Sequence, residues 1–156
     1  METENKERTF NFFRFEDLRV YHKALDYVKW VHKTTEDFPK TERSGIIEAY
    51  TKSATNIAIN IAEGSGRNRS QFIYYLKMAI SSIRECVVLS TIAHQKGLLN
   101  IAKEEESRNT LMEISKMVGA LIASLQRRSR QENEPEVSDS NSGTSDDDDV
   151  KDPNMY

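Results

Sequence analysis

Apolar residues recur at three- and four-residue steps along four successive stretches of the chain, and this pattern limits the fold more than any other feature. Such spacing places the apolar side chains on one face of an α-helix. The first two stretches predict helices over 16–37 and from 41 or 44 to 63. The other two predict helices over 70–95 and 100–128. No segment alternates apolar and polar residues for long enough to predict a strand.

Proline and glycine separate the helical stretches. Pro39 ends the first, because the residue before a proline is pushed out of the helical region. Gly64 and Gly66 are predicted to stop the second and Gly97 the third, since glycine accepts the left-handed conformation that closes helices. Helices of about 20–28 residues span roughly 30–42 Å. Similar lengths and short connections predict an all-α, antiparallel up-down four-helix bundle.

Charge and composition divide the chain into an N-terminal arm over 1–14, the bundle over 15–130 and an acidic tail over 131–156. Residues past Ser129 hold nine acidic and two basic side chains, which leaves 20 basic and 16 acidic side chains in the rest. The net charge of -3 therefore hides a mildly basic body. The tail is too polar to bury enough surface to offset its ordering entropy, so we expect it to be disordered. The arm and the residue after it carry aromatic side chains, which we expect to pack on the body or on a neighbouring subunit: Phe10, Phe12, Phe13 and Phe15.

The lone Cys86 and the absence of long apolar runs indicate the cellular compartment in which we expect the protein. One cysteine cannot form a disulfide within the chain and fits a reducing cytoplasm. No stretch approaches the roughly 20 apolar residues of a membrane span. The first residues are polar and carry both charges, unlike a secretory leader. We expect a cytoplasmic protein without a membrane partner.

Sequence signatures of catalysis are missing. His22, His32 and His94 are not spaced as metal ligands, and neither the zinc nor the di-iron motifs occur. No phosphate-binding loop or dinucleotide fingerprint is present. Some RNA-cleaving bundles use an Arg and a His four to six residues apart, a spacing this chain lacks. Cys86 lies within an apolar run and is predicted to be a small buried residue. We expect no catalytic residue, metal or cofactor, and hence no enzyme.

Basic residues give the stronger functional signal. The second and fourth helices of an antiparallel bundle end side by side, so we expect their basic clusters to form one patch able to contact nucleic-acid phosphates. A plain solvated surface is the alternative interpretation of such charges. The candidate nucleic-acid-binding residues from composition are Lys23, Lys29, Lys33, Arg67, Arg69, Arg127, Arg128 and Arg130.

Short motifs in a fixed order add a family resemblance. The run from Asn60 to Gly64, followed by Gly66 and Arg67, is the strongest of them. Further matching positions are Phe15, Leu18, Val20, Lys23, Ala24, Phe38, Pro39, Phe72, Leu76, Ala79, Ser82 and Glu85. From Phe15 to about Ser129 the chain resembles the four-helix bundle family associated with intervening sequences of 23S ribosomal RNA. That bacterial family is similar to the accessory variability protein of diversity-generating retroelements. The motif residues assigned a structural role are Asn60, Glu63, Gly64 and Glu85.

The resemblance implies a homo-pentamer with a basic surface for RNA or DNA and no catalytic residues. In the retroelement branch it implies a reverse transcriptase and its RNA as partners. The chain departs from the family pattern at Tyr21, where tryptophan is usual, and at Ala58, where proline is common. Thr51 replaces a residue that is often basic, and the adjacent Lys52 keeps a charge there, so Lys52 joins the candidate binding residues.

Two functional hypotheses follow. The first is a non-enzymatic, homo-oligomeric accessory protein that binds nucleic acid or a ribonucleoprotein. The second is a protein-only interaction scaffold in which Trp30, Tyr74 and Tyr75 dock a partner. Charge reversal at the basic residues separates them, because only nucleic-acid binding depends on those charges.

Overall fold

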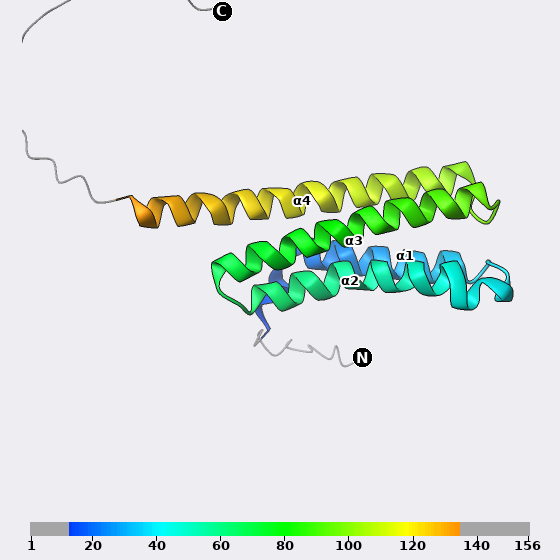
Figure 1. Ribbon diagram of the computed structural model, residues 1–156, viewed down its shortest axis with the longest axis horizontal. Helices are drawn as coiled ribbons and strands as arrows, with labels where there is room; N and C mark the ends of the chain where they lie inside the picture. The colour runs from blue at the N-terminus through cyan, green and yellow to red at the C-terminus, as the bar shows by residue number, and fades with distance from the viewer. Residues whose placement is uncertain (1–12, 135–156) are drawn as a thin grey trace, which may run out of the picture.

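A computed structural model describes residues 13–134, which form four long α-helices in an antiparallel up-down bundle (Figure 1). The helices are α1 (Arg19–Thr35), α2 (Glu48–Ser65), α3 (Arg69–Gln95) and α4 (Ile101–Asn133). α1 and α3 each pack against both α2 and α4. The described range contains no strand, and the predicted all-α fold is confirmed. Residues 1–12 of the predicted arm and 135–156 of the predicted tail lie outside the described residues, whereas 131–134, the first residues of the predicted tail, lie within them.

All four helices contribute to one apolar core. Each presents a buried stripe, represented by Val31 on α1, Ile57 on α2, Leu76 on α3 and Ile114 on α4. Fully burying a side chain of this size stabilises the fold by about 1.5–3 kcal/mol. On α2, α3 and α4 the stripes are those expected from the helical periodicity, which explains why the sequence predicts the bundle. On α1 only Val31 of the expected stripe is buried. The other buried apolar residues there are Val20, Ala24 and Tyr27, whereas the side chains that share the expected spacing are only partly buried: Leu18, Tyr21, Leu25 and Val28. No helix within residues 13–134 combines the length and apolar character needed to cross a membrane.

The first helix begins later than predicted. Arg14–Asp17 form a short 3-10 turn, η1, and Leu18 is extended before α1 starts. The edge of Phe15 packs on Tyr21, with ring centroids 5.0 Å apart. This aromatic contact folds the chain back onto α1, and Glu16 and Asp17 belong to the turn and not to the helix. α1 also ends at Thr35, before the predicted end at Asp37.

The second helix is also shorter at its start than predicted. A 3-10 turn, η2 (Lys40–Glu42), and a π-helical turn, η3 (Arg43–Ile47), precede α2. Within η3, Gly45 has φ −106° and ψ −111°, outside the helical region. The break turns Ile46 inward, where it is buried in a smaller apolar cluster with Phe38 and Leu99. The burial of Ile46 at this end of the bundle is therefore favoured over a helix that continues without a break into α2.

The last helix continues to Asn133, beyond both the predicted end at Arg128 and the expected bundle boundary at 130. In Figure 1 its final turns extend past the loop that joins α2 to α3. The apolar stripe of α4 stops at Leu125, and Glu132 follows on the same face. The polar end of α4 thus begins where its neighbours end.

Candidate nucleic-acid interface at the α2–α3 end of the bundle

The Asn60–Gly64 motif sets how closely α3 approaches α2. Gly64 is buried, and a Cβ added there would lie 2.7 Å from Tyr75 Cβ and 2.9 Å from Phe72 Cδ2. Only glycine allows this approach. α2 runs through Gly64 and ends at Ser65, with Gly66 as its C-cap, so the predicted stop is confirmed at Gly66. The expected left-handed conformation is wrong, because neither glycine has positive φ.

The other motif residues make local polar contacts. Asn60 Nδ2 donates to Asn56 O at 2.8 Å within α2. Ser53 Oγ donates to Glu85 Oε2 at 2.9 Å, which links α2 to α3. The first contact lies within α2, and the second joins α2 to α3.

Glu63 and Tyr75 fix the orientation of Arg67. The Arg67 Nη2 atom donates to Glu63 Oε1 at 2.5 Å, and its Nε atom donates to the same oxygen at 3.2 Å. The guanidinium carbon lies 5.1 Å from the centre of the Tyr75 ring. The hydrogen bond with Glu63 raises the pKa of Arg67. Arg67 therefore presents a fixed guanidinium plane, and its charge is compensated.

Arg69, the first residue of α3, connects the start of that helix to the end of α4. Its two terminal nitrogens donate to the two carboxylate oxygens of Glu132 at 2.6 and 2.9 Å. This bidentate contact lowers the pKa of the Glu132 carboxyl, chiefly through hydrogen bonding. The loop and the end of α4 therefore lie together, as the antiparallel topology predicts. Near them, Arg127, Arg128 and Arg130 are exposed and form no ion pair within residues 13–134.

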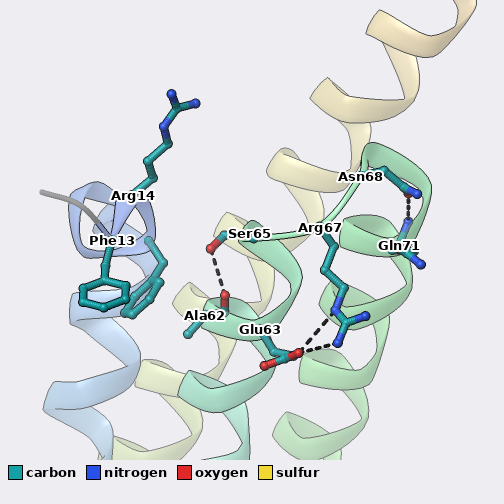
Figure 2. A pocket seen from close by; sticks show the side chains of 10 residues that line it. Phe13, Arg14, Ala62, Glu63, Ser65, Arg67, Asn68 and Gln71 are labelled. Carbon is teal, nitrogen blue, oxygen red and sulfur yellow. Dashed lines mark hydrogen bonds and ion pairs between the residues drawn. The ribbon is translucent and has the colours of Figure 1, made fainter.

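A cavity of about 690 Å³ opens at this end between η1, the end of α2 and the start of α3. Figure 2 shows Phe13 and Arg14 on one side, and Arg67, Asn68 and Gln71 on the other. Phe13 is 54% exposed. The residues that line the cavity are Phe13, Arg14, Phe15, Ala62, Glu63, Ser65, Gly66, Arg67, Asn68 and Gln71.

The sequence predicted only some of the residues that line this cavity. It included Arg67, and it expected the aromatic residues near the start to pack on the body, as Phe15 does on Tyr21. It missed Arg14, Asn68 and Gln71. Asn68 had a recognisable signal, because it is the N-cap of α3 and its Oδ1 accepts the Gln71 backbone N–H at 2.9 Å.

The remaining predicted cations lie elsewhere. Lys23 on α1 forms an ion pair with Glu113 on α4. Lys29, Lys33 and Lys52 are exposed, and none lines the cavity. The nine candidate residues therefore do not form one continuous surface.

The family of 23S rRNA-intervening sequence proteins matches residues 16–120 of this chain. The chain belongs to this family. The match covers α1, α2, α3 and most of α4, and it includes the Asn60–Gly64 motif and Arg67. The resemblance to this family drawn from the motifs is confirmed.

A solved structure supports the fold of this family member. It is a protein with unknown function of the S23 ribosomal protein family from Bacteroides thetaiotaomicron VPI-5482. The two chains superpose with a TM-score of 0.62 at 20% sequence identity, covering 67% of this chain and 95% of the other. No curated protein matches the sequence significantly.

The core of this family member contains a buried hydroxyl cluster. Tyr27 Oη lies 2.9 Å from Tyr50 Oη and 2.7 Å from Ser107 Oγ, and Tyr50 and Ser107 are 3.0 Å apart. Burial raises the pKa of both tyrosines and raises the pKa of Cys86 to about 12. The thiol is therefore protonated at neutral pH and poorly nucleophilic. The hydroxyl cluster joins α1, α2 and α4 by hydrogen bonds, and we interpret it as part of the packing of the core.

Glu104 is a second polar core residue that sequence reasoning missed. It is only 6% exposed. Its Oε1 accepts from Arg108 Nε at 3.3 Å and from Thr91 Oγ1 at 3.4 Å, and His94 Nδ1 lies 3.8 Å from Oε2. Within the described part of the chain, no group of three His, Cys, Asp or Glu side chains could hold a metal ion.

Proposed function

We propose that the chain is a non-enzymatic RNA-binding accessory protein that assembles with copies of itself. The observation that carries this proposal is the convergence of cationic, amide and aromatic side chains from η1, the α2–α3 loop and α4 at one end of the bundle. RNA is favoured over DNA because the description of the family refers to 23S rRNA. A reverse transcriptase with its RNA is one partner of this class.

Ion pairing separates the basic residues into two groups. Lys23, Arg67 and Arg69 each contact a carboxylate, so their charges are compensated within the protein. Arg127, Arg128 and Arg130 lack such a contact within residues 13–134, and so does Arg14. A cation that already has a carboxylate partner must lose it, or share it, to contact a phosphate. We therefore assign the phosphate contacts chiefly to the second group.

The RNA-binding proposal is tested by titrating the full chain with structured RNA over a range of salt concentrations. Binding should weaken as salt rises, because each phosphate contact releases counterions. Replacing Arg127, Arg128 and Arg130 together by glutamine should weaken binding and reduce the salt dependence. A matched double variant, Lys29→Gln with Lys33→Gln, changes exposed cations outside the cavity and should have a smaller effect. No binding of the wild-type chain at low salt would disprove the proposal.

Self-assembly is supported by exposed apolar side chains on the outer face of α3. Tyr74, Met78, Val88 and Ile92 are all well exposed and follow one helical stripe. The stripe forms two apolar pairs, Tyr74 with Met78 and Val88 with Ile92, separated by the exposed Ser81 and Glu85. Exposed apolar side chains grouped in this way are typical of interaction sites. We take the pentamer as the specific assembly, from the family to which the chain belongs. Replacing Met78 and Val88 by glutamate should lower the molar mass measured by light scattering, whereas Ile101→Glu, at an exposed apolar site on α4, should not.

A protein-only scaffold is the second candidate, and the exposure of Tyr74, at 59%, favours it. The other two proposed docking residues are engaged within the bundle. Tyr75 lies beneath the Arg67 guanidinium, and Trp30 stacks on Tyr27 with ring centroids 5.8 Å apart. A scaffold would keep its protein partner after the arginine substitutions, which is the result that separates the two functions. For either function we propose the cytoplasm, where the buried thiol of Cys86 stays reduced.

A further inference from the structure

We propose that the cavity beside η1 binds a single unpaired nucleotide of RNA, with its base stacked on Phe13. This inference rests on the proposed RNA binding and narrows it to RNA with a loop, bulge or free end. In A-form duplexes the bases are stacked and paired, whereas unpaired bases can swing out and stack on aromatic side chains. The cavity volume of about 690 Å³ falls within the roughly 300–1,000 Å³ of small-ligand pockets.

Phe13 offers a supported aromatic surface at the cavity mouth. Its ring is 54% exposed. Its centroid lies 5.8 Å from that of Phe15, whose ring in turn packs on Tyr21. An exposed ring held by a second ring loses little conformational freedom when a base stacks on it.

The opposite wall supplies groups suited to a base edge. Asn68 uses its Oδ1 atom to cap α3, which leaves its amide N–H groups as donors. Gln71 adds an exposed side-chain amide, and Figure 2 shows both residues on the wall that also carries Arg67. The Glu63 carboxylate can accept from a base amino group. Donors and acceptors thus belong to the cavity lining, and in Figure 2 the side chains of Asn68 and Gln71 lie beyond Arg67 as seen from Phe13.

The charges around the cavity indicate that the phosphate of the bound nucleotide lies on the η1 side. Glu63 lines the cavity and holds Arg67, so the wall with the amides has little net positive charge. Arg14 lines the other side, forms no ion pair within residues 13–134, and extends away from the helices in Figure 2. Glu16 and Asp17 belong to the same turn but do not line the cavity, so a phosphate next to Arg14 can contact a guanidinium that forms no ion pair within residues 13–134.

Two RNA probes distinguish this pocket from general RNA binding. One is a hairpin with 2-aminopurine in its single-stranded loop, and the other is a fully paired duplex of the same composition. The full chain should bind the hairpin more tightly and change its 2-aminopurine fluorescence. Phe13→Ala should weaken hairpin binding by about 5- to 150-fold and leave duplex binding unchanged. Phe13→Trp should retain hairpin binding, because tryptophan also stacks.

Tyr74→Ala is the matched control, since it removes an exposed aromatic outside the cavity, and it should leave hairpin binding unchanged. Arg14→Gln should lower the salt slope for the hairpin by about one. If the chain binds neither RNA at low salt, the proposed function itself fails. If it binds both equally and Phe13→Ala has no effect, only the nucleotide pocket is disproved. If Phe13→Ala leaves RNA affinity unchanged but abolishes binding of an acidic, tyrosine-containing peptide, the cavity belongs to a protein partner and the proposal is overturned.

Discussion

Gly64 on α2 and Tyr75 on α3 approach so closely that a Cβ atom at position 64 would lie 2.7 Å from Tyr75 Cβ. Tyr75 also lies beneath the guanidinium of Arg67, which Glu63 holds in place. The close helix contact and the fixed arginine are therefore neighbouring features of one short motif. The motif shapes the cavity wall through packing and does not need a chemical role.

The first prediction is that Gly64→Ala destabilises the fold. The new methyl group must displace α3, and overpacking of this kind costs about 1–3 kcal/mol. The free energy of unfolding from urea titration measures the effect. Gly119→Ala is the control, because nothing lies within 4 Å of a Cβ at that exposed position in α4. Alanine there should stabilise the fold by about 0.5–1 kcal/mol. Equal effects of the two substitutions would contradict the steric explanation.

The second prediction concerns alkaline pH. Burial raises the pKa of Cys86 from 9.0 to about 12, and burial also raises the pKa of Tyr27 and Tyr50. Above pH 9 the unfolded chain releases the thiol proton while the folded chain keeps it, so the unfolded state binds fewer protons. Stability is therefore complete below pH 9 and falls as pH rises, by about 1.4 kcal/mol per pH unit for each fully affected group. The tyrosines add to the loss above pH 10.

Unfolding free energies measured from pH 7 to 11 check this prediction. Cys86→Ala removes the thiol, so its stability should stay flat between pH 9 and 10, whatever the baseline change from lost packing. Tyr50→Phe should reduce the slope above pH 10. A wild-type stability that does not change between pH 8 and 11 would show that these groups ionise equally in both states.

The fold was predictable because helical periodicity records which face of each segment is buried. The helix ends were less predictable, since they depend on contacts distant in sequence or on local packing. The start of α1 is displaced by the contact between Phe15 and Tyr21, and the start of α2 by the inward turn of Ile46. Gly97 has φ 73° and was predictable, because a left-handed stop needs only local geometry.

The candidate site was predictable only in part, for the same reason. Composition identifies basic residues but does not show which of them are compensated. Arg69 meets Glu132 across 63 positions, and Lys23 meets Glu113 from another helix. Such pairs depend on the bundle geometry. The cavity likewise combines η1 with the α2–α3 loop, two segments that no single motif connects.

The third prediction is that Arg108→Ala destabilises the fold. This substitution leaves the buried Glu104 carboxylate with Thr91 as its remaining hydrogen-bond donor, and an under-satisfied buried charge costs about 1–3 kcal/mol. Arg84→Ala removes an exposed arginine from α3 and should change stability by about 0.5 kcal/mol or less. Thermal unfolding of both variants gives the comparison. If Glu104→Gln restores the stability lost in Arg108→Ala, the charge is the cause.

The fourth prediction concerns the end of α4, which extends past its neighbouring helices. Its apolar stripe ends at Leu125, so its last turns depend on the contact between Arg69 and Glu132. Arg69→Gln should accelerate amide hydrogen exchange in residues 126–133 and leave the buried parts of α1 and α2 unchanged. Arg130→Gln alters a cation in the same turns that forms no ion pair within residues 13–134, and it should cause little acceleration. Because the pKa of Glu132 is lowered, the wild-type protection should persist as pH falls through 4.5 and be lost only at lower pH. Equal exchange in the wild type and Arg69→Gln would mean that the final turns are held by intrahelical bonds alone.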